Sequence, residues 1–275
     1  MSACSQHEVR GGGGVALHVR EWGRRDARPI VFVHGWSQSH MCWLEQYDSP
    51  LADDFRLVCF DSRGHGQSDK PMRSRAYTQG KPWADDLAAV IDTLRLRRPV
   101  LVAWSYGGYI VGDYLSRYGQ DRIGGINFVA AATLKNAAGA LLGPAFKTLA
   151  PLMADPDPHV AIDGTRRFVR ACTHRPLAPA VFETVLAFNM LTPAPVRGWM
   201  VQRELDFSGT LGRLSVPVLV SIGMEDRIVL PAMGEYTLAR VAHARASQYE
   251  LVAHAPFLEA PARFNRELAE LVGST

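Results

Sequence analysis

A series of short, largely apolar runs recurs along this 275-residue chain and constrains its fold more than any other feature of the sequence. Most of the runs are rich in Val, Ile or Leu and end beside a Gly, His, Asp or Ser residue. Runs that are apolar throughout are typical of strands buried on both faces of a parallel sheet. The predicted strands are residues 29–33, 56–60, 99–103, 123–130, 217–222 and 248–252, with 15–22 as an edge strand after a flexible opening.

Helical patterns separate these predicted strands. Strands that alternate with helices through short connections predict an α/β fold with a doubly wound, mostly parallel sheet. In such sheets ligands bind beyond the carboxyl ends of the strands, so the polar residues that follow the strands are the first candidates for a site. Apolar residues recur at helical spacing over residues 83–96, 106–118, 233–241 and 257–272.

One long segment, residues 134–211, interrupts this alternation. It shows no convincing strand, and its helical stretches are separated by clusters of proline. The segment is too long for an ordinary loop, so we expect an inserted helical cap over the functional edge of the sheet. The predicted domains are therefore a core of residues 1–133 and 212–275 and a cap of residues 134–211.

Composition excludes several classes of protein. The formal charge of +3 and the lack of any Lys/Arg block argue against a nucleic-acid partner. The four cysteines have neither metal nor disulfide spacing, which predicts reduced thiols, a cytoplasmic location and no metal site. The chain opens without an apolar signal region, and no apolar stretch approaches the ~18 residues that a membrane helix needs. A homo-oligomer remains compatible with the sequence.

The strongest local signal is Ala103-Trp104-Ser105-Tyr106-Gly107-Gly108, which lies between a predicted strand and a predicted helix. It matches the G-x-S-x-G nucleophile elbow, with Ala103 in place of the first glycine. The turn is tight enough to require small residues on both sides of the nucleophile, and it presents the serine at a helix N-terminus. The alternative is an ordinary strand-to-helix turn that happens to contain a serine.

A serine hydroxyl needs a base, and the base needs an orienting carboxylate. His254 follows the last predicted strand, and Asp226 follows the strand at 217–222, which gives the chain order Ser, acid, His. Glu225 is an alternative acid, whereas the loop after residues 123–130 offers no carboxylate. Other histidines are interpreted as surface or core residues: His18, His40, His159, His174 and His243.

His34-Gly35-Trp36 follows the strand at 29–33. We expect the backbone N–H groups of Trp36 and Tyr106 to form an oxyanion hole, with His34 fixing the loop by hydrogen bonding. Apolar residues of the cap and of the last helix are expected to supply a desolvated pocket. The candidate pocket residues are Trp36, Phe146, Met153, Phe188, Met190, Trp199 and Phe257, with Leu152 and Phe182 also available.

Together these residues resemble the α/β-hydrolase superfamily, and more narrowly its branch of small carboxylesterases, enol-lactonases and cofactor-free haloperoxidase-like perhydrolases. The resemblance implies that residues 61–69 form a structural loop, tied down by Asp61 and Arg63, that also contains His65. Tyr106 is a departure, because haloperoxidase-like members often carry Met there. The matching stretches are HGW (34–36), DSRGHGQSD (61–69), AWSYGG (103–108), GMED (223–226) and HAPFLEAPARF (254–264).

The sequence therefore predicts a cofactor-free serine hydrolase that cleaves a small, largely apolar carboxylic ester or lactone through an acyl-enzyme. Ser105, where haloalkane dehalogenases and epoxide hydrolases need Asp, favours acyl transfer. Hydrolysis of a carbon–carbon bond, perhydrolysis and a cofactor-free dioxygenase activity remain alternatives. A further alternative is a protein that binds a small molecule without turning it over.

Overall fold

The computed structural model describes residues 4–135 and 141–275. Its centre is an eight-stranded sheet with the strand order β1-β2-β4-β3-β5-β6-β9-β10, antiparallel at the β1-β2-β4 end and parallel elsewhere. The α/β architecture and the mostly parallel sheet predicted from the sequence are confirmed. The strands are β1 (Cys4–Arg10), β2 (Ala16–Gly23), β3 (Pro29–Val33), β4 (Arg56–Phe60), β5 (Val100–Trp104), β6 (Gly125–Val129), β9 (Val218–Gly223) and β10 (Arg245–Tyr249).

Two strand predictions were wrong. The opening predicted to be flexible contains β1, which pairs with β2 along its length, so β2 is not an edge strand. The polar and largely exposed residues of β1 carry no apolar signal, and pairing rather than burial holds the strand. The last strand, β10, covers Arg245–Tyr249 and so starts and ends before the predicted strand at 248–252, because Leu251 and its neighbours form a turn after it.

The buried strands separate two apolar layers. Along β3, Ile30 and Phe32 pack on one face, whereas Val31 and Val33 pack on the other. This alternation follows from the two-residue period of a strand, with both faces covered by helices. One face packs against α4 (Gly80–Thr93), α5 (Gly107–Tyr118) and α11 (Pro231–Leu238). The other packs against η2 (His40–Trp43), α1 (Leu44–Tyr47), α2 (Leu51–Asp54), α12 (Pro256–Glu259) and α13 (Pro261–Gly273). Short elements complete the core: η1 (Gly12–Gly14), α3 (Arg75–Thr78) and α10 (Ser208–Leu211).

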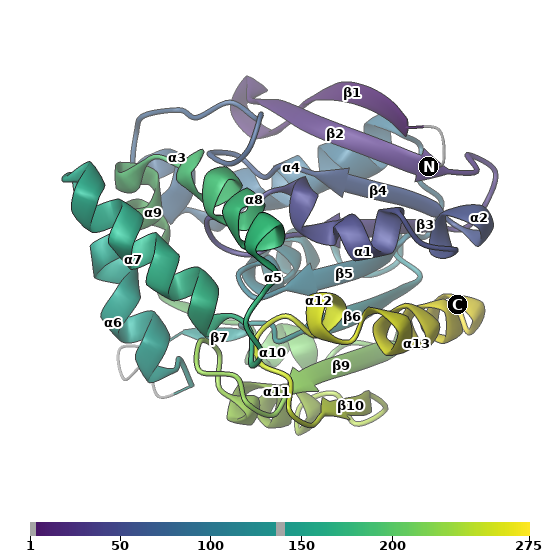
Figure 1. Ribbon diagram of the computed structural model, residues 1–275. Helices are drawn as coiled ribbons and strands as arrows, with labels where there is room; N and C mark the ends of the chain where they lie inside the picture. The colour runs from purple at the N-terminus through teal and green to yellow at the C-terminus, as the bar shows by residue number, and fades with distance from the viewer. Residues whose placement is uncertain (1–3, 136–140) are drawn as a thin grey trace.

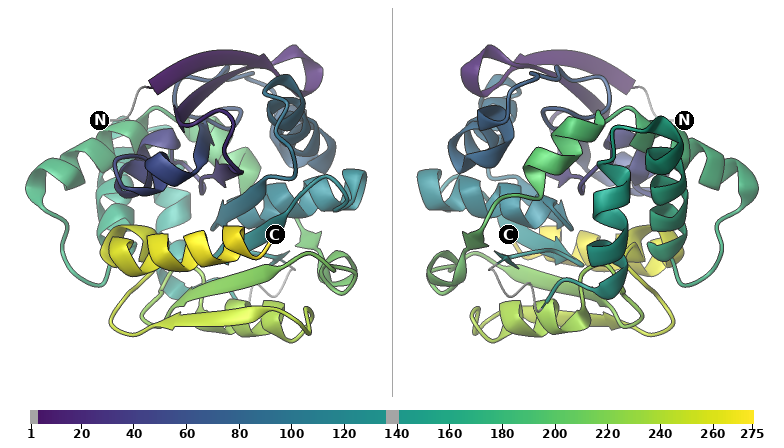
Figure 2. Two further views of the ribbon diagram at one scale, coloured as in Figure 1. Left: turned by 90° about the vertical axis from the view of Figure 1, so that its right-hand side faces the viewer. Right: turned by 90° about the vertical axis from the view of Figure 1, so that its left-hand side faces the viewer.

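Between β6 and β9, ahead of α10, the described residues form four consecutive longer helices: α6 (Pro144–Met153), α7 (Pro158–Ala171), α8 (Pro179–Met190) and α9 (Ala194–Met200). Each begins with a proline in its first turn, where the missing N–H costs nothing, and this explains the proline clusters. We call residues 144–200 the α6–α9 segment. Its helices gather at one end of the sheet (Figure 1) and face the viewer on the right of Figure 2.

The expectation that residues 134–211 hold no strand was wrong. A two-stranded antiparallel sheet forms from β7 (Leu134–Lys135) and β8 (Leu205–Asp206), one before and one after the α6–α9 segment. Such short strands leave no sequence pattern, because two residues cannot show a period. In the described part of the chain, no helix is both long and apolar enough to cross a bilayer.

Candidate active site

Ser105 stands on the turn between β5 and α5, in a strained backbone conformation with φ of 54°. Its N–H donates to Val129 O at 3.1 Å, and its carbonyl accepts the N–H of Gly108 at 2.9 Å. A Cβ on Gly107 would lie 2.4 Å from Val33 O, and one on Gly108 would lie 2.5 Å from Ala132 O. The two glycines therefore allow the helix to approach the sheet closely enough for this turn. A positive φ on a serine is costly and is found where surrounding structure holds it, often at functional sites.

Asp226 and His254 form a buried pair at the same sheet edge. His254 Nδ1 lies 2.7 Å from Asp226 Oδ2, and the two side chains are almost completely buried. The other carboxylate oxygen, Oδ1, accepts the N–H groups of Ile228 at 2.7 Å and Val229 at 3.1 Å. A carboxylate held on both oxygens keeps the imidazole proton on Nδ1 and leaves Nε2 free to act as a base.

The backbone of His254 is fixed from two further directions. Its N–H donates to Cys172 O at 3.0 Å, just after α7, and its carbonyl accepts Trp104 Nε1–H at 2.8 Å. Because Trp104 precedes Ser105 in the chain, this contact connects the nucleophile turn to the base. In the described residues, however, no hydrogen bond joins Ser105 Oγ to His254 Nε2. Hydrogen bonds of this kind commonly tighten only when substrate binds.

The loop after β3 lies against the nucleophile. A Cβ on Gly35 would be 3.0 Å from Ser105 Cβ and 3.5 Å from Ser105 Oγ, so only glycine leaves this approach open. His34 Nδ1–H donates to Gly35 O at 2.8 Å, and His34 Nε2 accepts the N–H of Ser62 at 3.0 Å. Burial lowers the pKa of His34, which keeps the ring neutral. His34 thus fixes the loop rather than moving a proton.

The two candidate oxyanion donors remain free. Among the hydrogen bonds of the described residues, none is donated by the backbone N–H of Trp36 or Tyr106. Tyr106 is the N-cap of α5, where free backbone N–H groups are usual. The free N–H of Trp36 is therefore the stronger indication of an oxyanion hole. Within the described residues, Trp36 and Tyr106 line the same cavity as Ser105, and backbone N–H groups without a partner there are what an oxyanion hole requires.

A cavity of about 30 Å³ opens at Ser105. Trp36 and Phe146, both predicted pocket residues, line it, and their rings meet edge to face at 5.5 Å. The remaining walls could not be predicted from the sequence, because most of them are apolar residues of a kind found in any core. These walls are formed by Tyr109, Ala132, Lys135, Leu142, Phe168, Met200, Val201, Ile228 and Val229, with Tyr106 beside the serine.

The other predicted pocket residues lie elsewhere, so their placement in the Ser105 pocket is corrected. Phe188 and Phe257 line a second, larger cavity of about 220 Å³, together with Trp104. The lining drawn from the described residues of that cavity includes neither Ser105 nor its predicted partners. Met153 is fully buried in the core, and Met190 contacts Arg197. Trp199 stacks on Tyr77 at 5.8 Å. The direction in which each of these side chains points depends on how the helices pack. Helical periodicity in the sequence does not reveal it.

Comparison with known proteins identifies the fold family. A sequence profile described as alpha/beta hydrolase fold matches residues 28–261. The chain belongs to this family. Over 95% of its length it is 28% identical to a non-heme chloroperoxidase of Streptomyces lividans, of which it covers 97%. It is 27% identical to a non-heme haloperoxidase of Rhodococcus erythropolis, over 88% of this chain and 90% of that protein.

Solved structures of α/β-hydrolases agree with this assignment. The esterase RhEst1 from Rhodococcus sp. ECU1013 matches with a TM-score of 0.93 and 32% identity, over 98% of this chain and 99% of that one. The predicted resemblance to the esterase and haloperoxidase-like branch of the superfamily is therefore confirmed.

One polar group near the site of this α/β-hydrolase left no sequence signal. Arg203 Nη2 bonds both carboxylate oxygens of Asp113, at 2.7 and 2.8 Å, and Arg203 Nη1 lies 3.3 Å from the hydroxyl of Tyr106. All three side chains are buried. This ion pair braces the residue that follows the nucleophile, and only the fold brings residues so distant in sequence together.

Proposed function

We propose that this α/β-hydrolase cleaves small, largely apolar carboxylic esters or lactones through a Ser105-His254-Asp226 triad. The observation that carries the proposal is the buried 2.7 Å pair of Asp226 and His254, at the same sheet edge as a serine held in a strained nucleophile turn. A buried carboxylate–imidazole pair beside such a turn is the arrangement that activates a weak hydroxyl nucleophile.

In the proposed cycle, Ser105 Oγ attacks the substrate carbonyl while His254 Nε2 takes the hydroxyl proton. The N–H groups of Trp36 and Tyr106 hold the oxyanion of the tetrahedral intermediate. His254 then gives its proton to the leaving alkoxide, and an acyl-Ser105 remains. Water, deprotonated by His254, then attacks the acyl carbon. The bond from that carbon to Ser105 Oγ breaks as His254 returns the proton to Oγ, and the carboxylic acid is released. Asp226 stays ionised throughout and stabilises the imidazolium.

We further propose that residues 134–211 act as the cap and that the α6–α9 segment limits the size of the acyl group. Phe146 and Phe168 of that segment meet the Trp36 ring at 5.5 and 5.6 Å, which narrows the cavity at Ser105. A cavity of about 30 Å³ with mostly apolar walls leaves room for a short acyl chain at most. Shorter esters are therefore expected to be the better substrates.

A panel of p-nitrophenyl acetate, butyrate and octanoate with γ-butyrolactone tests this function. The wild-type protein should hydrolyse the acetate with the highest kcat/KM, and Ser105→Ala should abolish turnover of every ester. Ser116→Ala, on an exposed position of α5, is the matched control and should retain wild-type rates. Inertness of the wild-type protein towards the whole panel would refute the proposal.

Perhydrolysis is the second candidate, favoured by the likeness to a non-heme chloroperoxidase over 95% of the chain. In that reaction hydrogen peroxide replaces water as the acceptor of the acyl group, so an acyl-enzyme yields a peracid. Tyr106, which stands where haloperoxidase-like relatives often have Met, argues for hydrolysis as the main reaction. Peracid formation from acetate and peroxide, compared with ester hydrolysis in the same preparation, separates the two.

A further inference from the structure

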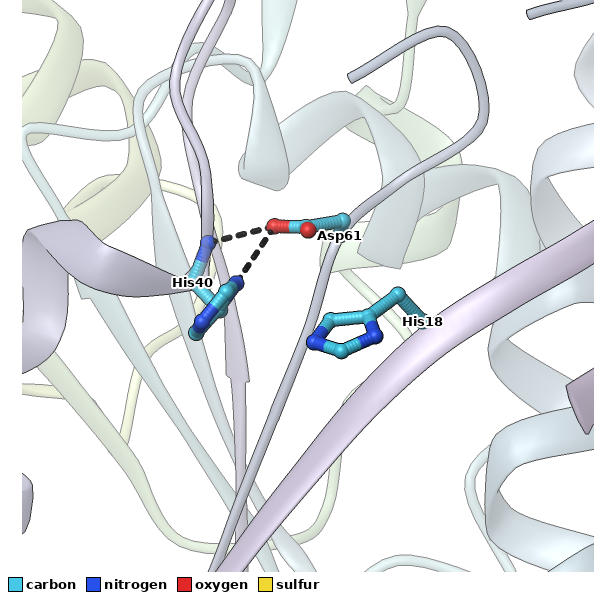
Figure 3. A group of neighbouring side chains, drawn as sticks. All are labelled: His18, His40 and Asp61. Atoms are coloured by element: carbon cyan, nitrogen blue, oxygen red, sulfur yellow. Dashed lines mark hydrogen bonds and ion pairs between the residues drawn. The ribbon is translucent and has the colours of Figure 1, made fainter. Parts of the chain in front are cut away.

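Three polar side chains outside the proposed active site converge in the interior. His18 comes from β2, His40 from η2, and Asp61 from the end of β4 (Figure 3). All three are buried, with exposed fractions of 7%, 5% and 0%. Two imidazoles and a carboxylate are a donor set that divalent transition metals prefer. We propose that His18, His40 and Asp61 form a binding site for a divalent transition-metal ion of the zinc type.

The positions of the donor atoms support this site. Each residue offers one ligand atom, and these atoms lie within 4.8 Å of one another. Ligands held about 2.1 Å from a tetrahedral zinc ion lie about 3.4 Å apart. Three protein ligands leave the fourth position of the ion to water.

His18 gives the most specific indication. Its Nε2 is buried and, within the part of the chain that the structure describes, has no hydrogen-bond partner. A buried polar atom left without a partner costs about 1–3 kcal/mol, so the fold gains when a ligand satisfies it. The His18 ring lies 5.1 Å from the His40 ring, centre to centre, and faces it in Figure 3.

Asp61 supplies the negative charge. Its Oδ1 accepts the backbone N–H of His40 at 2.7 Å and lies 2.9 Å from His40 Nδ1, while Oδ2 accepts the N–H of Gln67 at 2.8 Å. Burial raises the pKa of Asp61, but the bonds from His40 outweigh it and hold that pKa well below its usual range. When a metal ion binds His40 through Nδ1, the ring proton moves to Nε2, and the carboxylate then neutralises part of the ion's charge.

The ion would brace the loop that carries the oxyanion donor. His40 ends the stretch that begins at His34, and Asp61 begins the loop that also holds His34 through the N–H of Ser62. The sequence analysis expected no metal site, because His18, His40 and Asp61 lie far apart in the chain and match no ligand spacing. The proposed site is structural and independent of the proposed reaction.

Equilibrium dialysis and thermal unfolding of the full chain, with ZnCl₂ or after EDTA treatment, test the proposal. One equivalent of zinc should bind and raise the Tm, because a ligand that binds only the folded state stabilises it. His18→Gln removes only an unpartnered nitrogen and should weaken binding by at least about tenfold. His159→Gln, on an exposed position of α7, is the matched control and should bind as the wild type does.

A second readout uses Co²⁺, whose visible absorption reports four-coordinate geometry with nitrogen ligands. The wild-type protein should show these bands with one equivalent of Co²⁺, and His18→Gln should not. Absence of stoichiometric binding to the wild type, or equal binding by wild type and His18→Gln, would overturn the proposed site. Neither readout depends on hydrolysis, so failure of the proposed enzyme activity leaves this test unaffected.

Discussion

The sheet edge and the α6–α9 segment position their residues by different means. At the edge, hydrogen bonds from strand ends and loops hold the proposed catalytic residues: Ser105 through Val129 O, and Asp226 through two backbone N–H groups. The α6–α9 segment instead presents Phe146 and Phe168, which are placed by packing between helices. We infer that the backbone fixes the chemistry of this protein, whereas side-chain packing fixes its choice of substrate.

A buried arginine organises the α6–α9 segment. Arg197 is 1% exposed, and it donates to Met153 O at 2.7 Å and Asn189 O at 2.6 Å, near the carboxyl ends of α6 and α8. These helix ends carry partial negative charge, which compensates the cation. Burial lowers the pKa of Arg197 to about 10, so it stays protonated at neutral pH. Its own carbonyl accepts Trp36 Nε1–H at 3.2 Å, which links the segment to the oxyanion loop.

The largest expected effect is on kcat, and it comes from a substitution at the sheet edge. Asp226→Asn should lower kcat for p-nitrophenyl acetate by about 10⁴-fold, the scale seen when a triad loses the carboxylate that fixes its imidazole. The Tm should change little, since the amide preserves the size of the side chain. Glu225→Gln, at the neighbouring and partly exposed position, is the control. An equal loss of kcat in that variant would show that Asp226 is not the specific partner of His254.

The next effect is on stability rather than chemistry. Arg197→Met leaves Met153 O without this donor and removes one of three donors to Asn189 O, which keeps the Ser37 hydroxyl and the Thr192 N–H, so it should destabilise the fold by about 1–3 kcal/mol. Urea unfolding measures this loss, and Arg167→Met, at an exposed position of α7, serves as control. If Arg197→Met lowered kcat as strongly as Asp226→Asn while keeping wild-type stability, the division between the two regions would fail.

A smaller effect tests how closely the oxyanion loop approaches the nucleophile. Gly35→Ala places a methyl group 3.0 Å from Ser105 Cβ, which must push the loop or the serine aside. We expect kcat to fall by about 10–100-fold, consistent with a disturbed oxyanion hole. Gly273→Ala is the control, because its added methyl group meets no neighbour within 4 Å. Unchanged kcat in Gly35→Ala would remove the loop from the mechanism.

The sequence predicted the candidate site residues at the sheet edge better than the pocket residues of the α6–α9 segment, and the reason is physical. A nucleophile turn demands small residues at fixed spacing, so Ala103, Gly107 and Gly108 mark Ser105 without reference to the rest of the chain. Asp226 follows β9, and the end of that strand can be located from its apolar run. Both signals are local.

Pocket walls have no such local signature. Phe146 and Phe188 both belong to apolar helices, yet only the first reaches the cavity at Ser105. Which helix face turns towards that cavity depends on contacts such as those of Arg197, which join residues far apart in sequence. Strand β1 was missed for a related reason, because pairing with β2 holds it and its own sequence is polar.

The smallest expected effect contrasts the two cavities. Phe146→Ala enlarges the cavity at Ser105 and should raise the kcat/KM ratio of p-nitrophenyl octanoate to acetate by about 4–15-fold, the value of one or two buried methylene groups. Phe188→Ala enlarges the second cavity instead and should leave that ratio unchanged. The reverse result would place the acyl chain in the second cavity.

Covalent trapping tests the central claim most directly. The protein is incubated with a p-nitrophenyl alkylphosphonate, digested and mapped by mass spectrometry. The account predicts a single adduct on Ser105, complete loss of esterase activity as one equivalent reacts, and no labelling of Ser105→Ala. An adduct on another residue, or full esterase activity in Ser105→Ala, would contradict it.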